Sequence, residues 1–193
     1  MADDDAEARE EVHEEAAEAP PEVPVPSDEV AAALFERIPG TVFVESHGQA
    51  VVHVAREQWH DVAAFLRDEQ QFTQCVDVCG VDQLVAPTRA IPPDVTPERF
   101  EVVANYLSHV RNRRIRVIAQ VPSDDPTIAS ISDLYPGVNF AERETYDLFG
   151  VEFTGHPDLT RILMPDDWVG HPLRKDDAPA RVPVTFKGDP SPR

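Results

Sequence analysis

Histidines and carboxylates that could bind a metal or transfer protons are concentrated between Glu142 and Pro179. His156, Asp158 and His171 are the residue types that ligate zinc, or that act as acid and base in hydrolysis. Each histidine precedes a proline, which restricts the histidine backbone to extended geometry and indicates loops rather than one shared helical face. The motifs H-E-x-x-H and G-x-S-x-G are absent from the sequence. A stand-alone metal-dependent hydrolase therefore stays an alternative that metal analysis would test.

The same stretch also has the composition of a surface that binds another protein. Prolines are frequent and apolar pairs are few in residues 151–193, so we predict an extended arm without a hydrophobic core. Arg161, Arg174 and Lys175 alternate with aspartates, and mixed-sign clusters of this kind set the register of interfaces. Trp168 offers an apolar anchor of the type found at interface centres. From the residues alone, docking to a protein is favoured over catalysis.

The chain has two cysteines, Cys75 and Cys79, in a segment whose alternating valines predict a strand. Positions four apart on a strand share one face and lie about 13 Å apart. A disulfide needs Cα atoms within about 7 Å, so we expect no bridge. Two thiols also cannot complete a four-ligand zinc site or hold an iron–sulfur cluster. We therefore expect two buried thiols in a reducing compartment.

Acidic residues outnumber basic ones by 36 to 17, which gives a formal charge of −19. A field of this sign repels phosphate backbones and anionic lipid. The arginine turn at residues 111–116, with Tyr106 nearby, makes an RNA-binding module a further rival that a salt-sensitive gel shift would reveal. The sequence contains no run of about 18 apolar residues, so we expect membrane association only through a partner.

Composition and periodicity divide the chain into three parts. Residues 1–27 are rich in Ala, Glu and Pro and are predicted to be a disordered acidic tail. Residues 28–150 are predicted to be an α+β domain, with a mostly antiparallel sheet and helices on one face, and residues 151–193 are the extended Pro-rich docking arm. We predict helices at 28–38, 56–71, 124–137 and 138–150, and strands at 41–45, 50–55, 72–81, 100–110 and 114–121.

Polar residues predict how the last two helices begin and which pairs they form. Asp125 is expected to cap the helix at 124–137. Asn139 and Glu142 have the spacing of a capping box at the start of the next helix. Arg143 and Asp147 are four residues apart on that helix, so they can pair on one face.

One long motif occupies residues 142–177: ERETYDLFGVEFTGHPDLTRILMPDDWVGHPLRKDD. It closely resembles the signature of the 30-kDa subunit, the C-type subunit of bacteria, of respiratory NADH:quinone oxidoreductase (complex I). The shared pattern is E-R-E-x-x-D-x-[FY]-G-[IV]-x-F-x-G-H-P-x-L-x-R-[IL]-L, followed by D-W-x-G-[HY]-P-L-R-K-D. Family members often have tryptophan where Phe140 stands here, and an aromatic residue where Asp177 stands here.

The resemblance implies a subunit with no cofactor of its own, in a complex that uses NADH, FMN, iron–sulfur clusters and quinone and that pumps protons. It implies docking to the 49-kDa-type quinone-site subunit, the D-type subunit of bacteria, and to its B-type neighbour. It also implies a peripheral position on the cytoplasmic side of the cell membrane. The equivalent subunit of a complex I relative, such as a membrane-bound hydrogenase, must dock to a similar partner subunit and therefore stays an alternative.

On this resemblance we expect the acidic and basic residues at the start of the motif to form a salt-bridge network where the arm begins. We further expect the arm's Arg161, Arg174 and Lys175 to reach carboxylates or carbonyls of the partner. No catalytic or metal-ligating residue is expected. The expected interface residues are Glu142, Arg143, Glu144, Asp147, His156, Arg161, Trp168, His171, Arg174, Lys175 and Asp176.

Overall fold

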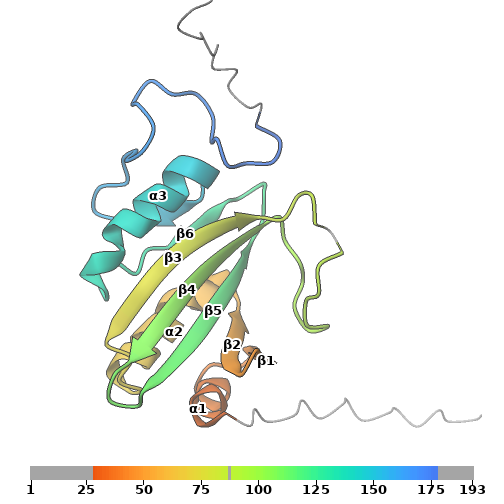
Figure 1. The fold of residues 1–193 in the computed structure, drawn as a ribbon, viewed down its shortest axis with the longest axis vertical. Coiled ribbons are helices and arrows are strands. Elements are labelled where there is room, and N and C mark those ends of the chain that lie inside the picture. The colour runs from red at the N-terminus through yellow and green to blue at the C-terminus, as the bar shows by residue number, and fades with distance from the viewer. Residues whose placement is uncertain (1–27, 87, 178–193) are drawn as a thin grey trace, which may run out of the picture.

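The computed structural model describes residues 28–86 and 88–177; the predicted tail at 1–27 and the last part of the predicted arm, 178–193, lie outside the described residues (Figure 1). The elements in chain order are α1 (Glu29–Arg37), β1 (Val42–Ser46), β2 (Gln49–Val54), η1 (Arg56–Gln58), α2 (Trp59–Asp68), β3 (Gln74–Asp82), β4 (Phe100–Ser108), β5 (Arg113–Val121), β6 (Thr127–Ala129), η2 (Pro136–Val138), α3 (Asn139–Phe149) and β7 (Glu152–Thr154).

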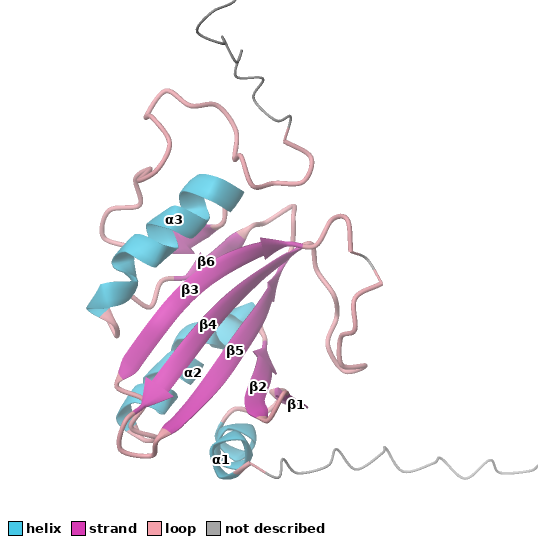
Figure 2. Ribbon diagram, in the orientation of Figure 1, coloured by secondary structure: helices cyan, strands magenta, loops and turns pink. Residues whose placement is uncertain are grey.

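A five-stranded sheet forms the centre of the domain, with the strand order β1-β2-β5-β4-β3. The pairs β1–β2, β3–β4 and β4–β5 are antiparallel, and β2–β5 is parallel. Figure 2 shows the long strands as one layer with α2 behind them. The predicted α+β fold with a mostly antiparallel sheet is thus confirmed.

The core lies between the sheet and the helices. Every second residue of β4, from Phe100 to Ser108, is buried on the face that the helices cover. α2 presents Trp59, Val62 and Leu66 to this face, and all three are fully buried. They lie on the apolar stripe that the helical periodicity predicts.

Gly80 lets α3 pack directly on β3. A Cβ atom at this position would lie 2.8 Å from Cγ2 of Thr145 and 2.9 Å from Cδ2 of Phe149, which is closer than side chains pack. Gly80 pairs with Val102 of β4, which is fully buried. Because paired residues in an antiparallel ladder point to the same face, α3 lies on the face that carries the core.

The two cysteines lie on opposite faces of β3, because a bulge interrupts the strand between Cys75 and Asp77. Cys75 pairs with Tyr106, a core residue, whereas Cys79 pairs with Val103 on the other face. The prediction of one shared face is therefore wrong. Both thiols are free and half-buried. Burial raises the pKa of Cys75 to about 12 and also raises the pKa of Cys79.

Residues 124–137 do not form the predicted helix. The segment begins with β6, which pairs parallel with β7, and ends in η2. Asp125 caps no helix and instead accepts a hydrogen bond from Arg56 Nη2 at 2.8 Å. The β-branched residues of β6 favour a strand once a partner strand is available, and this tertiary pairing outweighs the local helix signal.

The residues just after Gly150 still contribute to the compact domain. β7 pairs with β6, and Val151 and Phe153 are buried in the core. From residue 155 to residue 177 the chain forms turns and loops without helix or strand (Figure 2). We call residues 155–177 the arm segment. None of the helices in the described part of the chain is both long and apolar enough to cross a membrane.

Candidate functional site: the arm segment on helix α3

The arm segment attaches to the C-terminal end of α3 (Figure 1). A helix leaves its last four backbone carbonyls without helical partners. Gly150 adopts the left-handed conformation, with a φ of 72°, and ends the helix as the sequence predicts. The Leu173 N–H donates to the carbonyl of Leu148, and the Arg174 guanidinium donates to the carbonyls of Phe149 and Gly150. The arm segment therefore supplies hydrogen-bond donors to the end of this helix.

Asp147 binds the beginning of the arm segment with both carboxylate oxygens. Arg161 donates to Oδ1, and the backbone N–H groups of Ile162, Leu163 and Met164 donate to Oδ2 at 2.8–3.0 Å. The side chain of Asp147 is fully buried. Burial acts to raise its pKa, but the three N–H groups and the guanidinium outweigh burial and lower the pKa to about 2. Asp147 is therefore an ionised anchor for this turn.

Arg161 and His171 connect the arm segment to itself and to α3. Arg161 Nη1 also donates to the carbonyl of Asp147, and Nη2 donates to the carbonyl of Gly170 at 3.0 Å. His171 Nδ1 lies 3.0 Å from that same Asp147 carbonyl. The His171 N–H donates to Asp177 Oδ2 at 2.7 Å. These contacts bring residues 161, 170 and 171 together at the helix end.

A second attachment joins the end of the arm segment to the sheet. Arg99 donates to Asp82 at the end of β3 and to Asp176 of the arm segment. The Lys175 N–H donates to Asp82 Oδ2 at 2.9 Å. Burial acts to raise the pKa of Asp82, but Arg99 and the N–H donors outweigh burial and lower the pKa. Arg174 and Arg99 also lie over the Phe100 ring, with Cζ 5.1 Å and 4.8 Å from its centroid.

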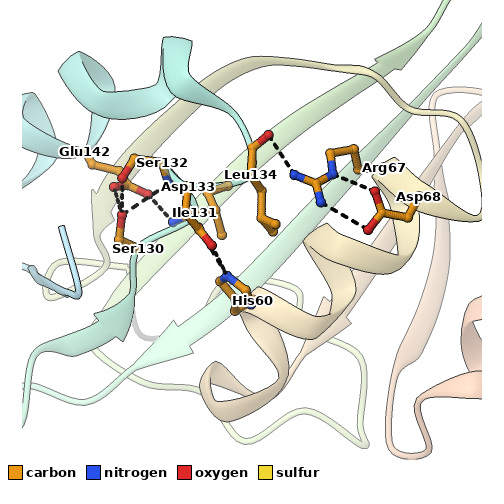
Figure 3. Close-up of polar contacts among 9 residues, drawn as sticks. All are labelled: His60, Arg67, Asp68, Ser130, Ile131, Ser132, Asp133, Leu134 and Glu142. Carbon is orange, nitrogen blue, oxygen red and sulfur yellow. Dashed lines mark hydrogen bonds and ion pairs between the residues drawn. The ribbon is translucent and has the colours of Figure 1, made fainter. Parts of the chain in front are cut away.

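Glu142 does not form the predicted capping box, because its carboxylate binds Ser130 and Ile131 instead. It is fully buried and accepts hydrogen bonds from Ser130 Oγ at 2.6 Å and from the Ile131 N–H at 2.8 Å (Figure 3). Burial outweighs these two neutral donors and raises the pKa of Glu142. Glu142 thus fixes the chain between β6 and η2 against α3.

The segment that Glu142 holds is also attached to α2. Asp133 lies 3.0 Å from His60 Nε2, and the carbonyl of Leu134 accepts a hydrogen bond from Arg67 (Figure 3). Arg67 is itself paired with the neighbouring Asp68. Residues 130–134 therefore connect α2 to α3 through polar contacts on both sides.

The predicted salt-bridge network of the ERE helix is not formed as expected. Arg143 does not pair with Asp147; it donates to Oγ1 and the carbonyl of Thr160 and to the carbonyl of Arg161. Glu144 is exposed and has no ion pair among the described residues. Asp147 takes Arg161 as its partner, because the arm segment also offers it three backbone donors that a surface pair within the helix cannot offer.

The two arm histidines make separate contacts. The Asp158 N–H donates to His156 Nδ1, and His156 Nε2 lies 3.2 Å from the Asn139 carbonyl and 3.9 Å from Glu142. His171 contacts Asp147 instead. Within residues 28–86 and 88–177, three or more His, Cys, Asp or Glu side chains do not come together at any position in a way that could hold a metal ion.

The remaining predicted interface residues face solvent to different degrees. Trp168 is half-buried, its backbone N–H donates to the Pro165 carbonyl, and its indole N–H has no hydrogen-bond partner among the described residues. Lys175 is exposed, and its ammonium group makes no ion pair with the described residues. By contrast, Arg161 and Arg174 are hydrogen-bonded to α3 of their own chain.

Sequence reasoning missed Asp82 and Arg99, which hold the end of the arm segment. Arg99 lies 77 residues before Asp176, and Lys175 lies 93 residues after Asp82. No periodic or capping signal in one sequence relates positions this far apart. Only the fold, which brings the end of β3 and the start of β4 beside the arm segment, shows their role.

Comparison with known proteins identifies relatives along most of the chain. Residues 52–182 match the family described as respiratory-chain NADH dehydrogenase, 30 Kd subunit. The chain is 42% identical over 170 residues to the C-type subunit of NADH-quinone oxidoreductase from Mycolicibacterium gilvum, with 83% of this chain and 71% of that protein covered. It is 44% identical over 167 residues to the C-type subunit from a Nocardioides species, with 84% and 63% covered.

Two solved structures are similar in fold. A trypsin-resistant fragment (1-134) of Nqo5 superposes with a TM-score of 0.56 and 35% identity, over 66% of this chain and 96% of the fragment. A chain of the membrane-bound sulfane sulfur reductase, an archaeal respiratory membrane complex, superposes with a TM-score of 0.55 over 77% of this chain and 83% of that chain. At 21% identity this second likeness shows the fold alone.

The family match covers α2, β3 to β7, α3 and the arm segment, and the chain spans between 63% and 71% of the length of the two curated relatives. The signature that runs from Glu142 to Asp177 thus lies within the residues that match the family. The chain belongs to the family of the 30 kDa subunit of respiratory-chain NADH dehydrogenase, which is the C-type subunit of the NADH-quinone oxidoreductases known as complex I.

Proposed function

We propose that this chain is a structural subunit of the hydrophilic arm of proton-pumping NADH:quinone oxidoreductase, and that it docks the 49-kDa-type quinone-site subunit (D-type) and the B-type neighbour of that subunit. In this proposal the oxidation of NADH and the reduction of quinone take place on other subunits. FMN, the iron–sulfur clusters and quinone bind there as well. The chain lies at the cytoplasmic side of the cell membrane and is held there by its partners.

The orientation of side chains in the arm segment carries this proposal. Arg161 and Arg174 turn inward to the end of α3, and Asp176 pairs with Arg99 at the start of β4. Its large apolar side chains turn outward: Leu163 is 58% exposed and Val169 is 91% exposed. The segment thus binds its own domain through polar side chains and exposes apolar side chains to solvent. This arrangement is typical of a surface that becomes buried when a partner binds.

The arm segment is held in place before any partner binds. Asp147 holds residues 161–164 and Asp82 holds Lys175, so the segment is fixed to the domain at two places. Docking a segment that is already ordered loses less conformational entropy than docking a free chain. This supports a subunit whose task is to position its neighbours.

The buried acids also support a role without chemistry of its own. Glu142 and Asp147 are both fully buried and are hydrogen-bonded to backbone N–H groups of their own chain. Neither carboxylate is open to a substrate. The two cysteines lie on opposite faces of β3, and an iron–sulfur cluster needs about four such ligands together.

Affinity purification of the full chain from detergent-solubilised membranes tests the proposal. We expect the 49-kDa-type subunit, its B-type neighbour and the flavin-bearing subunits to co-purify, with NADH-dependent quinone reduction in the eluate. Companions that belong to a hydrogenase, without NADH-oxidising subunits, would instead support the complex I relative. Recovery of the chain alone from intact, active membranes would contradict both.

A further inference from the structure

Residues 161–170 of the arm segment form a closed loop, which we call the docking loop. Arg161 Nη2 donates to the Gly170 carbonyl and joins its two ends. Asp147 accepts from the N–H groups of residues 162–164 and holds one side of the loop against α3. Compact surface loops with joined ends are frequently functional, because their scaffold holds their side chains in place.

The docking loop turns apolar side chains to solvent. Val169 and Leu163 are the most exposed, and Ile162 is also exposed. Leu173, just beyond the loop, is exposed as well. Single exposed apolar residues are ordinary, but several within one short loop are typical of a surface that another molecule covers.

Apart from Lys175, the exposed charges of the arm segment that make no ion pair with the described residues are negative. Arg161 and Arg174 are hydrogen-bonded to α3, Arg143 to the carbonyls of Thr160 and Arg161, and Arg99 to two aspartates. In contrast, Asp158, Asp166 and Asp167 are exposed and make no ion pair with the described residues. The exposed cation of the described arm segment is Lys175, five residues beyond the loop. The docking loop therefore exposes apolar side chains together with unpaired aspartates, and we call Asp158, Asp166 and Asp167 its acidic rim.

From this arrangement we infer that the docking loop binds a partner subunit at an apolar depression lined by lysine and arginine side chains. The inference rests on the proposed function and specifies the partner surface. It reverses the expectation from the sequence, in which the arm supplies the cations and the partner supplies carboxylates or carbonyls. Opposite charges at the rim of an interface set register and exclude wrong partners, while buried apolar anchors give affinity.

A second copy of this chain does not suit the surface of the docking loop as a binding partner. The chain has a formal charge of −19, so two copies repel each other, and two acidic rims would face each other in a symmetric dimer. The chain's own residues 178–193, which include Arg181, Lys187 and Arg193, lie outside the described residues. The second experiment below distinguishes this occupant from a partner subunit.

The first experiment reverses the acidic rim in the full complex. The double variant Asp166→Lys with Asp167→Lys is compared with Glu36→Lys with Glu45→Lys, which reverses two exposed acids on α1 and β1 with the same change in net charge. We expect the rim variant to lower the yield of assembled complex on native gels by at least about tenfold, because like charges would then meet. We expect the control variant to assemble normally. Equal yields for the two variants would overturn the inference.

The second experiment identifies what covers the loop. In the complex, Val169→p-benzoylphenylalanine is irradiated and the crosslinked peptides are sequenced. A crosslink to another subunit, at an apolar site flanked by lysine or arginine, supports the inference. A crosslink to residues 178–193, to a second copy of this chain, or to an acidic site of another subunit overturns it.

The wild-type chain is measured beside each variant, so the two proposals fail separately. If the wild-type chain does not enter the complex, the proposed function fails. If the wild type assembles and the rim variant assembles equally well, the proposed function stands and the inference about the docking loop fails. Urea denaturation of both double variants shows that neither charge change has unfolded the domain.

Discussion

Asp147→Asn should release the arm segment from α3 while leaving the sheet intact. The pKa of Asp147 is lowered from its ordinary 3.8 to about 2. One pKa unit corresponds to about 1.4 kcal/mol, so the ionised carboxylate stabilises the attached arm segment by about 2 kcal/mol. The asparagine variant retains one carbonyl oxygen but loses the charge that faces Arg161 and that attracts the three N–H donors.

Hydrogen exchange measures this effect directly. The backbone amides of Ile162, Leu163 and Met164 donate to Asp147, so their protection reports whether the arm segment is attached. A loss of about 2 kcal/mol should accelerate their exchange by about 30-fold. The amides of β4 should exchange as in the wild type, because the sheet does not depend on this contact. Asp167→Asn, a change of the same kind at an exposed position, is the matched control.

The lowered pKa of Asp147 also predicts how the effect of Asp147→Asn on the arm segment changes with pH. The folded pKa of Asp147 is lowered, so the stabilisation is fully present above its ordinary pKa of 3.8 and is lost as the pH falls through about 2. The difference between the wild type and the asparagine variant should therefore be constant near neutrality and shrink in acid. Unchanged exchange of the three amides in Asp147→Asn at neutral pH would refute the reasoning.

Three further changes test the rest of the structure. Gly80→Ala places a Cβ atom 2.8 Å from Thr145 and should destabilise the domain by about 1–3 kcal/mol in urea denaturation; an unchanged midpoint would contradict the close packing of α3. Glu142 has a raised pKa, so its stabilisation is complete below its ordinary 4.5 and is lost as the pH rises through the folded value. In Glu142→Gln the free energy of unfolding should depend less on pH. If the wild type instead became more stable relative to the variant as the pH rises, this prediction would be contradicted. Cys75, with a pKa of about 12, should resist iodoacetamide at about pH 8 until the chain is unfolded; rapid alkylation of the folded protein would count against its burial.

Local patterns predicted most of the sheet and the long helices. Trp59, Val62 and Leu66 repeat at helical spacing, so α2 follows from the period alone. Gly150 after an amphipathic run marks the end of α3, because glycine adopts the left-handed conformation without strain. These signals depend on neighbours within about one or two helical turns, which a single sequence contains.

The errors share one physical cause, which is competition from partners far along the chain. Glu142 has the spacing of a capping box, but the burial of its side chain beside Ser130 offers it two donors elsewhere. Asp147 has Arg143 in reach on the helix surface, but the arm segment offers it a guanidinium and three N–H groups at once. Residues 127–129 read as helix until β7 is present to pair with them. Propensity and i,i+4 spacing are weak preferences that such contacts outweigh.

The arm arginines are subject to the same competition, because α3 of their own chain competes with a partner subunit for their guanidinium groups. Arg161 and Arg174 have the composition of residues that reach a partner, and the sequence gives no sign that α3 uses them first. A helix end with unpaired carbonyls and a negative dipole attracts guanidinium groups, so these arginines have a target within their own chain. Their role is then to fix the shape of the docking loop, and the contact with a partner falls to the side chains that remain exposed.

Glu142 and Asp147 lie on the same helix, α3, but their pKa values are shifted in opposite directions. Both carboxylates are fully buried, so burial acts on each to favour the protonated form. Asp147 receives three N–H groups and a cation, which reverse the effect of burial, whereas Glu142 receives two neutral donors, which do not. A rise in pH above 4.5, into the range where Glu142 loses its proton, therefore acts on the Glu142 side, where residues 130–134 connect α3 to α2, and leaves the Asp147 anchor ionised. The docking loop should present the same surface throughout this range, because the contact that orients it changes protonation only in strong acid.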